Sequence, residues 1–154
     1  MNILLISPSY PDTYWSFKHA LKFVAKKAAS PPLGLLTIAA MLPEDWERKL
    51  VDLNVCPLAD TDIRWADYVF IGAMSVQAAS VTEVVKKCRQ LEKKIVAGGP
   101  LFTGDPDAWS HIDHLVLNEA EITLPLFLAD LEKGFPQKIY QAEDYADMEL
   151  SPCP

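Results

Sequence analysis

Short apolar runs alternate with segments of helical character along this chain, and the alternation limits the fold more than any other feature. Five runs have the length and composition of strands, the second of them alternating like a partly exposed edge strand: residues 2–7, 48–55, 67–74, 93–99 and 114–118. Buried strands joined by helices build a mainly parallel sheet with helices on both faces. The sequence therefore predicts one doubly wound α/β domain with a mainly parallel five-stranded sheet in the flavodoxin-like order 2-1-3-4-5.

The helices carry signals that place their ends. Residues 33–42 are apolar nearly all round, and prolines stand before and after them. The segment from Ser80 to Leu91 keeps its apolar residues on one face, and Ser80 with Glu83 predicts a capping box at its start. A last helix is expected near residues 124–134, with Pro125 in its first turn and Gly134 as its C-terminal cap.

Length and charge exclude several classes of protein. The 154 residues suit one domain, and a net charge of −7 disfavours binding to a nucleic-acid backbone. No apolar run approaches the roughly 20 residues of a membrane-spanning helix. The three cysteines are odd in number and widely separated, so they form neither a disulfide framework nor a metal knuckle. We expect a cytoplasmic domain with no nucleic-acid partner and no transmembrane segment.

Unusual sequence follows four of the five predicted strands. In doubly wound folds, ligands bind beyond the carboxyl ends of the strands. A long connection, residues 8–30, follows the first strand, and the stretches MSVQAAS, GGPLFT and NEAE follow the third, fourth and fifth. The glycines Gly98 and Gly99 have two readings, a tight strand-to-helix turn or a bare backbone against a ligand. The elaboration of the neighbouring connections favours the ligand.

Several ligands are excluded by the residues at these places. The first connection lacks the glycines of a dinucleotide site and opens with prolines, which a flavodoxin-type phosphate loop does not. A phospho-acceptor aspartate is missing after the third strand. His111 and His114 are read as surface histidines and His19 as a packed or solvated residue, so no metal ligand and no catalytic residue is predicted.

The motifs then point to a known family. Ser75-x-Gln77 followed by Gly98-Gly99 resembles the Ser-x-Leu and Gly-Gly motifs of cobalamin-binding domains, with Gln77 in place of leucine. The stretches PPLGLLTIAAMLP, VDLNV, WADYVFIGAMSVQ, AGGPLFT and LNEAEITLP resemble the N-terminal domain of cobalamin-dependent radical SAM enzymes of the hopanoid methylase-like group. This resemblance implies a Rossmann-like cobalamin-binding domain at residues 1–140. It also implies a linker at residues 141–154 toward a radical SAM barrel absent from this chain.

The same resemblance implies a function and a set of binding residues. The domain would position (methyl)cobalamin, with neither its own base nor a histidine beneath cobalt, for methyl transfer to a substrate radical. The implied cofactor-binding residues are Ser9, Tyr10, Trp15, Ser75, Val76, Gln77, Gly98, Gly99, Pro100, Asn118 and Glu119. Tyr10, Tyr14 and Trp15 would cover the lower face of the corrin; alternatively they only pack the long connection.

Other components belong to the full-length protein that the resemblance implies. A [4Fe-4S] cluster and S-adenosylmethionine would be bound by the C-terminal radical SAM domain, because no cysteines here have the Cys-x-x-x-Cys-x-x-Cys spacing. The substrate would be a small molecule or a lipid. Two alternatives remain open: a degenerate domain that has lost cobalamin and serves in docking or substrate recognition, and a stand-alone small-molecule carrier.

Overall fold

Six parallel strands form one sheet at the centre of the molecule. The computed structural model describes residues 1–12 and 30–147. The sheet order is β2-β1-β3-β4-β5-β6, and every neighbouring pair is parallel. The strands are β1 (Asn2–Ser7), β2 (Glu47–Asp52), β3 (Tyr68–Gly72), β4 (Lys94–Gly98), β5 (His114–Val116) and β6 (Ile139–Tyr140). The predicted fold class and the order of the first five strands are confirmed, and β6 is an addition that two residues were too short to signal.

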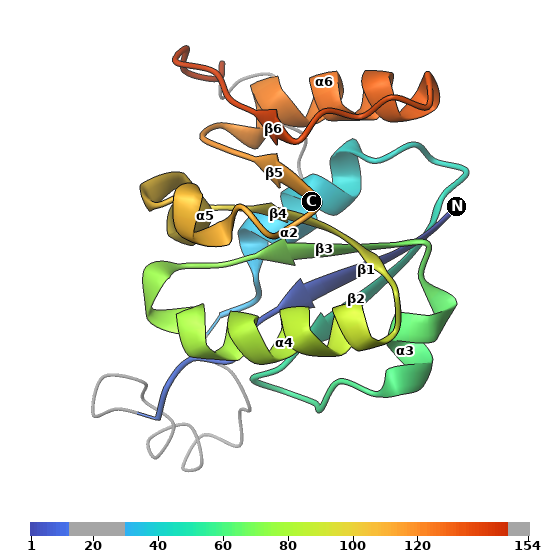
Figure 1. The fold of residues 1–154 in the computed structure, drawn as a ribbon, viewed down its shortest axis with the longest axis vertical. Helices are drawn as coiled ribbons and strands as arrows, with labels where there is room; N and C mark the ends of the chain where they lie inside the picture. Colours follow the sequence, from blue (N-terminus) through green and yellow to red (C-terminus); the bar gives the residue numbers. More distant parts are fainter. Residues whose placement is uncertain (13–29, 148–154) are drawn as a thin grey trace.

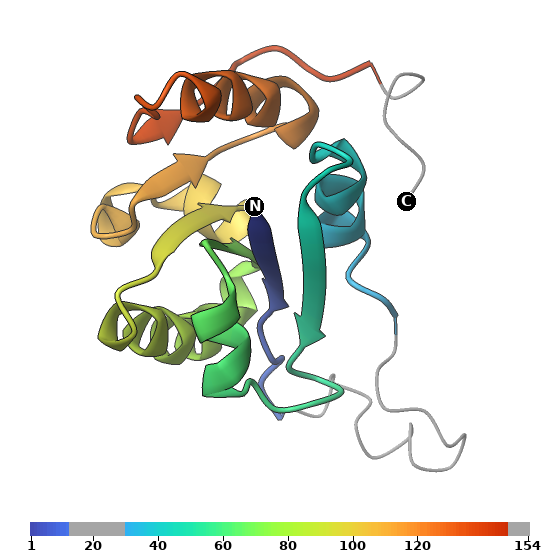
Figure 2. The same ribbon diagram turned by 90° about the vertical axis from the view of Figure 1, so that its right-hand side faces the viewer.

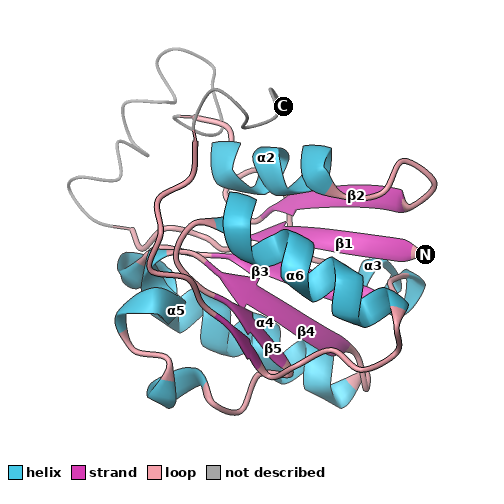
Figure 3. Ribbon diagram, turned by 90° about the horizontal axis from the view of Figure 1, so that it is seen from above, coloured by secondary structure: helices cyan, strands magenta, loops and turns pink. Residues whose placement is uncertain are grey.

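Helices cover both faces of the sheet (Figure 1). One face carries α2 (Leu33–Met41) and α6 (Ala120–Glu132), and the other carries α3 (Asp60–Trp65), α4 (Ala78–Gln90) and α5 (Pro100–Gly104) (Figure 3). Figure 2 shows α2 and α4 on opposite sides of the strands. Two 3-10 turns, η3 (Ser75–Gln77) and η4 (Asp107–Trp109), complete the order of elements. No helix of the described residues is long and apolar enough to cross a membrane.

The strands are apolar on both faces because both faces are covered. In β1, Ile3 and Leu5 pack beneath α2 and α6, while Leu4 and Ile6 pack beneath the helices of the other face. All four side chains are at most 1% exposed. This two-sided burial is why β1 reads as a continuous apolar run and not as an alternating one. The edge strand β2 differs, because its first four residues are exposed and Val51 is buried.

The periodicity of α4 predicted its buried face correctly. Val81, Val84, Val85 and Cys88 are all buried against the sheet. The predicted start of this helix at Ser80 was wrong. The helix α4 begins at Ala78, directly after η3, so Ser80 lies inside its first turn. The Ser80 hydroxyl oxygen accepts hydrogen bonds from the Ser9 amide at 2.9 Å and the Ser9 hydroxyl at 3.1 Å. Ser80 thus fastens the connection after β1 and caps no helix.

The sequence predicted the C-terminal end of α6 correctly and its start incorrectly. The helix begins at Ala120, so Pro125 lies in its second turn and not in its first as expected. Gly134 has φ +83°, and the Gly134 and Phe135 amides each donate a 3.0 Å hydrogen bond to the carbonyls of Leu131 and Asp130. This is a Schellman motif, which confirms Gly134 as the C-terminal cap.

Candidate functional site

A cavity of about 440 Å³ opens at the carboxyl ends of the central strands, on the face that carries α2 and α6. Its apolar walls come from the ends of β3, β4 and β5 and from the facing sides of the two helices, and include Phe70, Val96, Val116, Leu35 and Leu124. A doubly wound fold predicts its ligand site at this edge. The cavity lies where the sequence placed it.

The glycines at the end of β4 are required by the backbone itself. Gly99 has φ +97°, and a Cβ atom on it would lie 2.9 Å from the Ala73 carbonyl oxygen. A Cβ atom on Gly98 would lie 2.6 Å from the Val116 carbonyl oxygen. Both glycines also line the cavity. The two readings of this pair are therefore compatible, because a turn that only glycine can make leaves bare backbone as a cavity wall.

The motif residues after β3 lie at the rim. Ser75 and Val76 are exposed in η3 and do not line the cavity, whereas Gln77 is 3% exposed and does. The Gln77 Oε1 atom accepts a 2.8 Å hydrogen bond from the Met74 amide, and its Nε2 atom donates to the Pro8 carbonyl. Gln77 thus joins the connections after β1 and β3, a task that leucine at this position could not perform.

Residues 8–10, which we call the strap, follow β1 directly. The Tyr10 amide donates a 2.9 Å hydrogen bond to Asn54 Oδ1, and Ser9 is fastened to Ser80 as described above. The Tyr10 side chain is half-exposed, lines the cavity and lies with its hydroxyl 3.7 Å from the Met74 sulfur. Tyr14 and Trp15 fall outside the described residues.

The predicted residues after β4 and β5 meet at a second hollow of about 550 Å³. Pro100 and Asn118 line both hollows, and Glu119 lines the second alone. Asn118 adopts φ +61°; its amide donates to Thr103 Oγ1 at 3.0 Å, and its side-chain amide donates to the Ala142 carbonyl. The structure therefore gathers the described predicted residues along one edge of the sheet, in two adjoining hollows and on their rim.

Sequence reasoning missed two residues at the end of β2. Asp52 and Asn54 both line the first cavity, and Asp52 is the only charged residue among the described residues that do so. The Asn54 amide and Nδ2 group donate to Asp52 Oδ1 at 2.9 and 2.7 Å. The stretch VDLNV could have revealed them, because the carboxyl end of every parallel strand meets the same edge.

No histidine of the described residues lies at the cavity. His114 opens β5 at the opposite edge; its Nδ1 atom is 2.6 Å from the Gln137 carbonyl oxygen, and its buried Nε2 atom has no hydrogen-bond partner among the described residues. The expectation of a surface histidine is wrong for His114, which packs 5.3 Å from the Phe127 ring, and right for His111, which is exposed. The described residues contain no group of three or more His, Cys, Asp or Glu side chains that could hold a metal ion.

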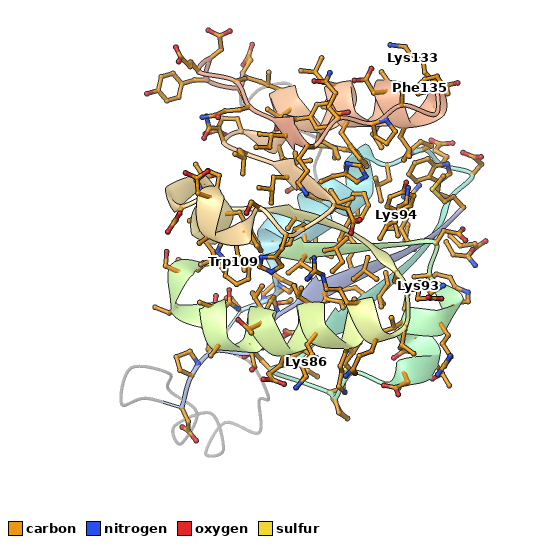
Figure 4. All side chains as sticks on the ribbon, in the orientation of Figure 1. Lys86, Lys93, Lys94, Trp109, Lys133 and Phe135 are labelled. Carbon is orange, nitrogen blue, oxygen red and sulfur yellow. The ribbon has the colours of Figure 1, made fainter. Side chains whose placement is uncertain are left out.

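The cationic side chains of the described residues lie away from the cavity. Lys86 lies along α4, and Lys93 and Lys94 lie toward the amino ends of the strands (Figure 4). Lys93 Nζ donates to the carbonyls of Arg64 and Ala66 at 2.9 and 2.6 Å, so this lysine ties the end of α3 to the sheet. No lysine or arginine of residues 1–12 and 30–147 lines the cavity.

Comparison with known proteins agrees with this geometry. The B12 binding domain family matches residues 22–128. The chain is 41% identical to an uncharacterised methyltransferase of Synechocystis sp.; the alignment covers all of this chain and 29% of that protein. It is 31% identical to the hopanoid C-2 methylase of Rhodopseudomonas palustris; that alignment covers 99% of this chain and 30% of the methylase. It thus spans under a third of the length of these relatives. No solved structure matches the chain. This chain belongs to the B12-binding domain family.

Proposed function

We propose that this chain holds cobalamin without a histidine beneath cobalt and positions it for methyl transfer within a longer enzyme. The observation that carries the proposal is the apolar cavity at the carboxyl ends of the strands, walled partly by bare backbone and free of histidine among the described residues. Both curated relatives are methyltransferases by name, which supports the reaction class.

The residues present fit a corrinoid. A corrin ring with its nucleotide is larger than the drug-sized ligands that cavities of this volume enclose. The cavity would therefore take the nucleotide tail, and the ring would lie over the opening beside Tyr10 and Met74. Ala120, the first residue of α6, also lines the cavity, and the amides of a helix N-terminus favour an anion such as the phosphodiester of the tail.

The protein's part in the reaction would be position and exclusion of water. Bound methylcobalamin supplies a transferable methyl group. Tyr10 and the exposed Met74 would give the corrin a mainly apolar neighbour at the rim. The two described histidines stand at or near the opposite edge of the sheet, so neither is placed to coordinate cobalt.

The remainder of the proposal concerns the longer protein. We take residues 141–154 as the linker to a radical SAM domain that would bind the [4Fe-4S] cluster and S-adenosylmethionine. Its substrate would be a small molecule or a lipid, and methylation would occur at a substrate radical. The length of the relatives leaves room for such a domain.

One observation favours a second candidate. Ser75, the serine of the resembling motif, does not line the cavity, and both polar atoms of the Gln77 that replaces leucine form hydrogen bonds within the protein, to Met74 and to Pro8 of the strap. A degenerate domain that no longer binds cobalamin and serves in docking or substrate recognition would also show these features.

Binding of hydroxocobalamin distinguishes the two candidates. We expect the purified chain to retain the corrinoid through gel filtration with a base-off visible spectrum. The variant Gly34→Phe should lose it while keeping the fold, because Gly34 lines the cavity and a Cβ atom there meets nothing within 4 Å. Free elution of unaltered base-on corrinoid would establish the degenerate domain.

The cobalt(II) form of the same complex tests the lower face. Its electron paramagnetic resonance spectrum should show no nitrogen splitting from an axial ligand. His19 lies outside the described residues, so the variant His19→Ala is the informative one. A nitrogen splitting in the parent that disappears in His19→Ala would place the chain among histidine-ligated cobalamin domains.

A further inference from the structure

Asp52 is the one charged group that the described residues contribute to the cavity. It is half-buried at the end of β2, and within residues 1–12 and 30–147 no lysine or arginine pairs with it. Its Oδ1 atom is already used, because it accepts both hydrogen bonds from Asn54. The described residues give its Oδ2 atom no donor.

A ligand over the mouth of the cavity would take water away from this carboxylate. A carboxylate that loses water is destabilised unless hydrogen-bond donors replace it. An ionised carboxylate only accepts hydrogen bonds, so the part of the ligand that meets Asp52 must be a donor. A phosphate or another carboxylate is excluded there by charge repulsion.

We propose that Asp52 is a specificity-determining residue that accepts a hydrogen bond from a primary amide on the edge of the corrin ring. The inference rests on the proposed binding of cobalamin, whose ring carries several acetamide and propionamide side chains. These amides are neutral N–H donors, which suit a site with one carboxylate and no cation.

The fastening of Asp52 makes it a fixed acceptor. Its partner Asn54 also donates to the Pro8 carbonyl at 3.3 Å and accepts from the Tyr10 amide. The carboxylate, the strap and the mouth of the cavity are therefore held in one hydrogen-bonded unit. Position and charge together would select corrinoids that present an amide at this point.

Two complementary changes test the inference: an amide of the ligand is replaced by a carboxylate, and the Asp52 carboxylate of the protein is replaced by an amide. The probes are hydroxocobalamin and its derivatives in which a single acetamide or propionamide is a carboxylic acid. The variant is Asp52→Asn, whose Oδ1 atom can still accept from Asn54 while its NH₂ group replaces Oδ2. Dissociation constants are measured by absorbance titration of the purified chain.

We expect the parent chain to bind one monoacid at least about tenfold more weakly than hydroxocobalamin, since a charge-assisted hydrogen bond is lost and two carboxylates meet. Asp52→Asn should bind hydroxocobalamin about tenfold more weakly than the parent chain does. It should also no longer disfavour that monoacid, because its amide can donate to the new carboxylate. Glu83→Gln, which removes one exposed negative charge on α4, should behave like the parent.

Three results would overturn the inference in distinguishable ways. If hydroxocobalamin binds to the parent chain but no monoacid separates the parent from Asp52→Asn, Asp52 does not meet an amide. If the parent binds no corrinoid, the proposed function falls and this inference with it. Should Asp52→Asn fail to fold by circular dichroism, Asp52→Ala replaces it, and retained discrimination against the monoacid in that variant would refute the inference.

Discussion

At the scale of single residues, glycine does two separate things at this edge of the sheet. Gly99 satisfies a positive φ and a close approach to the Ala73 carbonyl, whereas Gly34 stands in α2 with open space where a side chain would begin. The first is a requirement of the fold and the second is not. Cavity-blocking variants therefore belong at Gly34, because a change at Gly99 would disturb folding and binding together.

This difference predicts opposite effects of the same substitution. Gly99→Ala should lower the free energy of unfolding by about 1–3 kcal/mol, because a non-glycine residue would be held in a strained conformation against backbone. Gly34→Ala should raise it by about 0.5–1 kcal/mol, since alanine loses less entropy in a helix. Urea denaturation measures both, and equal effects would contradict the backbone assigned to Gly99.

Residue-level prediction from sequence found the strand ends that a motif marked. Gly98, Gly99 and Asn118 line the cavity at these strand ends, and their role in binding a cofactor stays a prediction. Asp52 and Asn54 were missed because β2 was treated only as an edge strand. Gln77 is turned inward by the hydrogen bond that it accepts from the Met74 amide and the one that it donates to the Pro8 carbonyl. Pro8 is far from Gln77 in the sequence, so no local sequence pattern could predict that contact.

At the scale of elements, α6 and β6 are joined by a polar cluster. Tyr140 donates to Asp130 Oδ2 at 3.2 Å, and its hydroxyl accepts from the Gln137 amide at 2.6 Å. The hydrogen bonds from Gln137 and then Lys133 hold the pKa of Asp130 below its ordinary value, whereas burial raises that of Tyr140. A two-residue strand is thus seated by side chains of the preceding helix and loop.

The lowered pKa of Asp130 predicts a dependence of stability on acid. Because the folded state favours the ionised carboxylate, its stabilisation is full above the unfolded pKa and is lost as pH falls, between about pH 5 and pH 2. Asp130→Asn should remove this component, so the two chains should differ in melting temperature at pH 7 and converge in acid. Curves that stay parallel down to pH 2 would contradict the assignment.

Elements were predictable in proportion to their length and periodicity. Strands buried on both faces and the amphipathic α4 stand out, because burial imposes their composition. The true start of α4 was hidden, because η3 runs into it without a separate cap. The early start of α6 was also hidden, since Thr123, whose hydroxyl bonds the Leu117 and Glu119 carbonyls, looks like an ordinary polar residue.

At the scale of the whole molecule, most charged side chains of the described residues lie away from the cavity. The net charge of −7 is spread over the chain, while one carboxylate and no described cation line the cavity. Corrinoid binding should therefore change by less than about threefold between about 50 and 500 mM sodium chloride, because no exposed ion pair is available for salt to screen. A steep fall with salt would show that cations outside the described residues contact the ligand.

The two borders of the sheet have a consequence for handling the protein. On one side β2 presents the exposed residues Glu47, Arg48 and Lys49, and on the other β6 is only two residues long. Charged or very short border strands give a second chain little to pair with, so they oppose intermolecular strand addition. The chain should therefore resist fibrous self-association at the high concentrations that spectroscopy of a coloured complex requires.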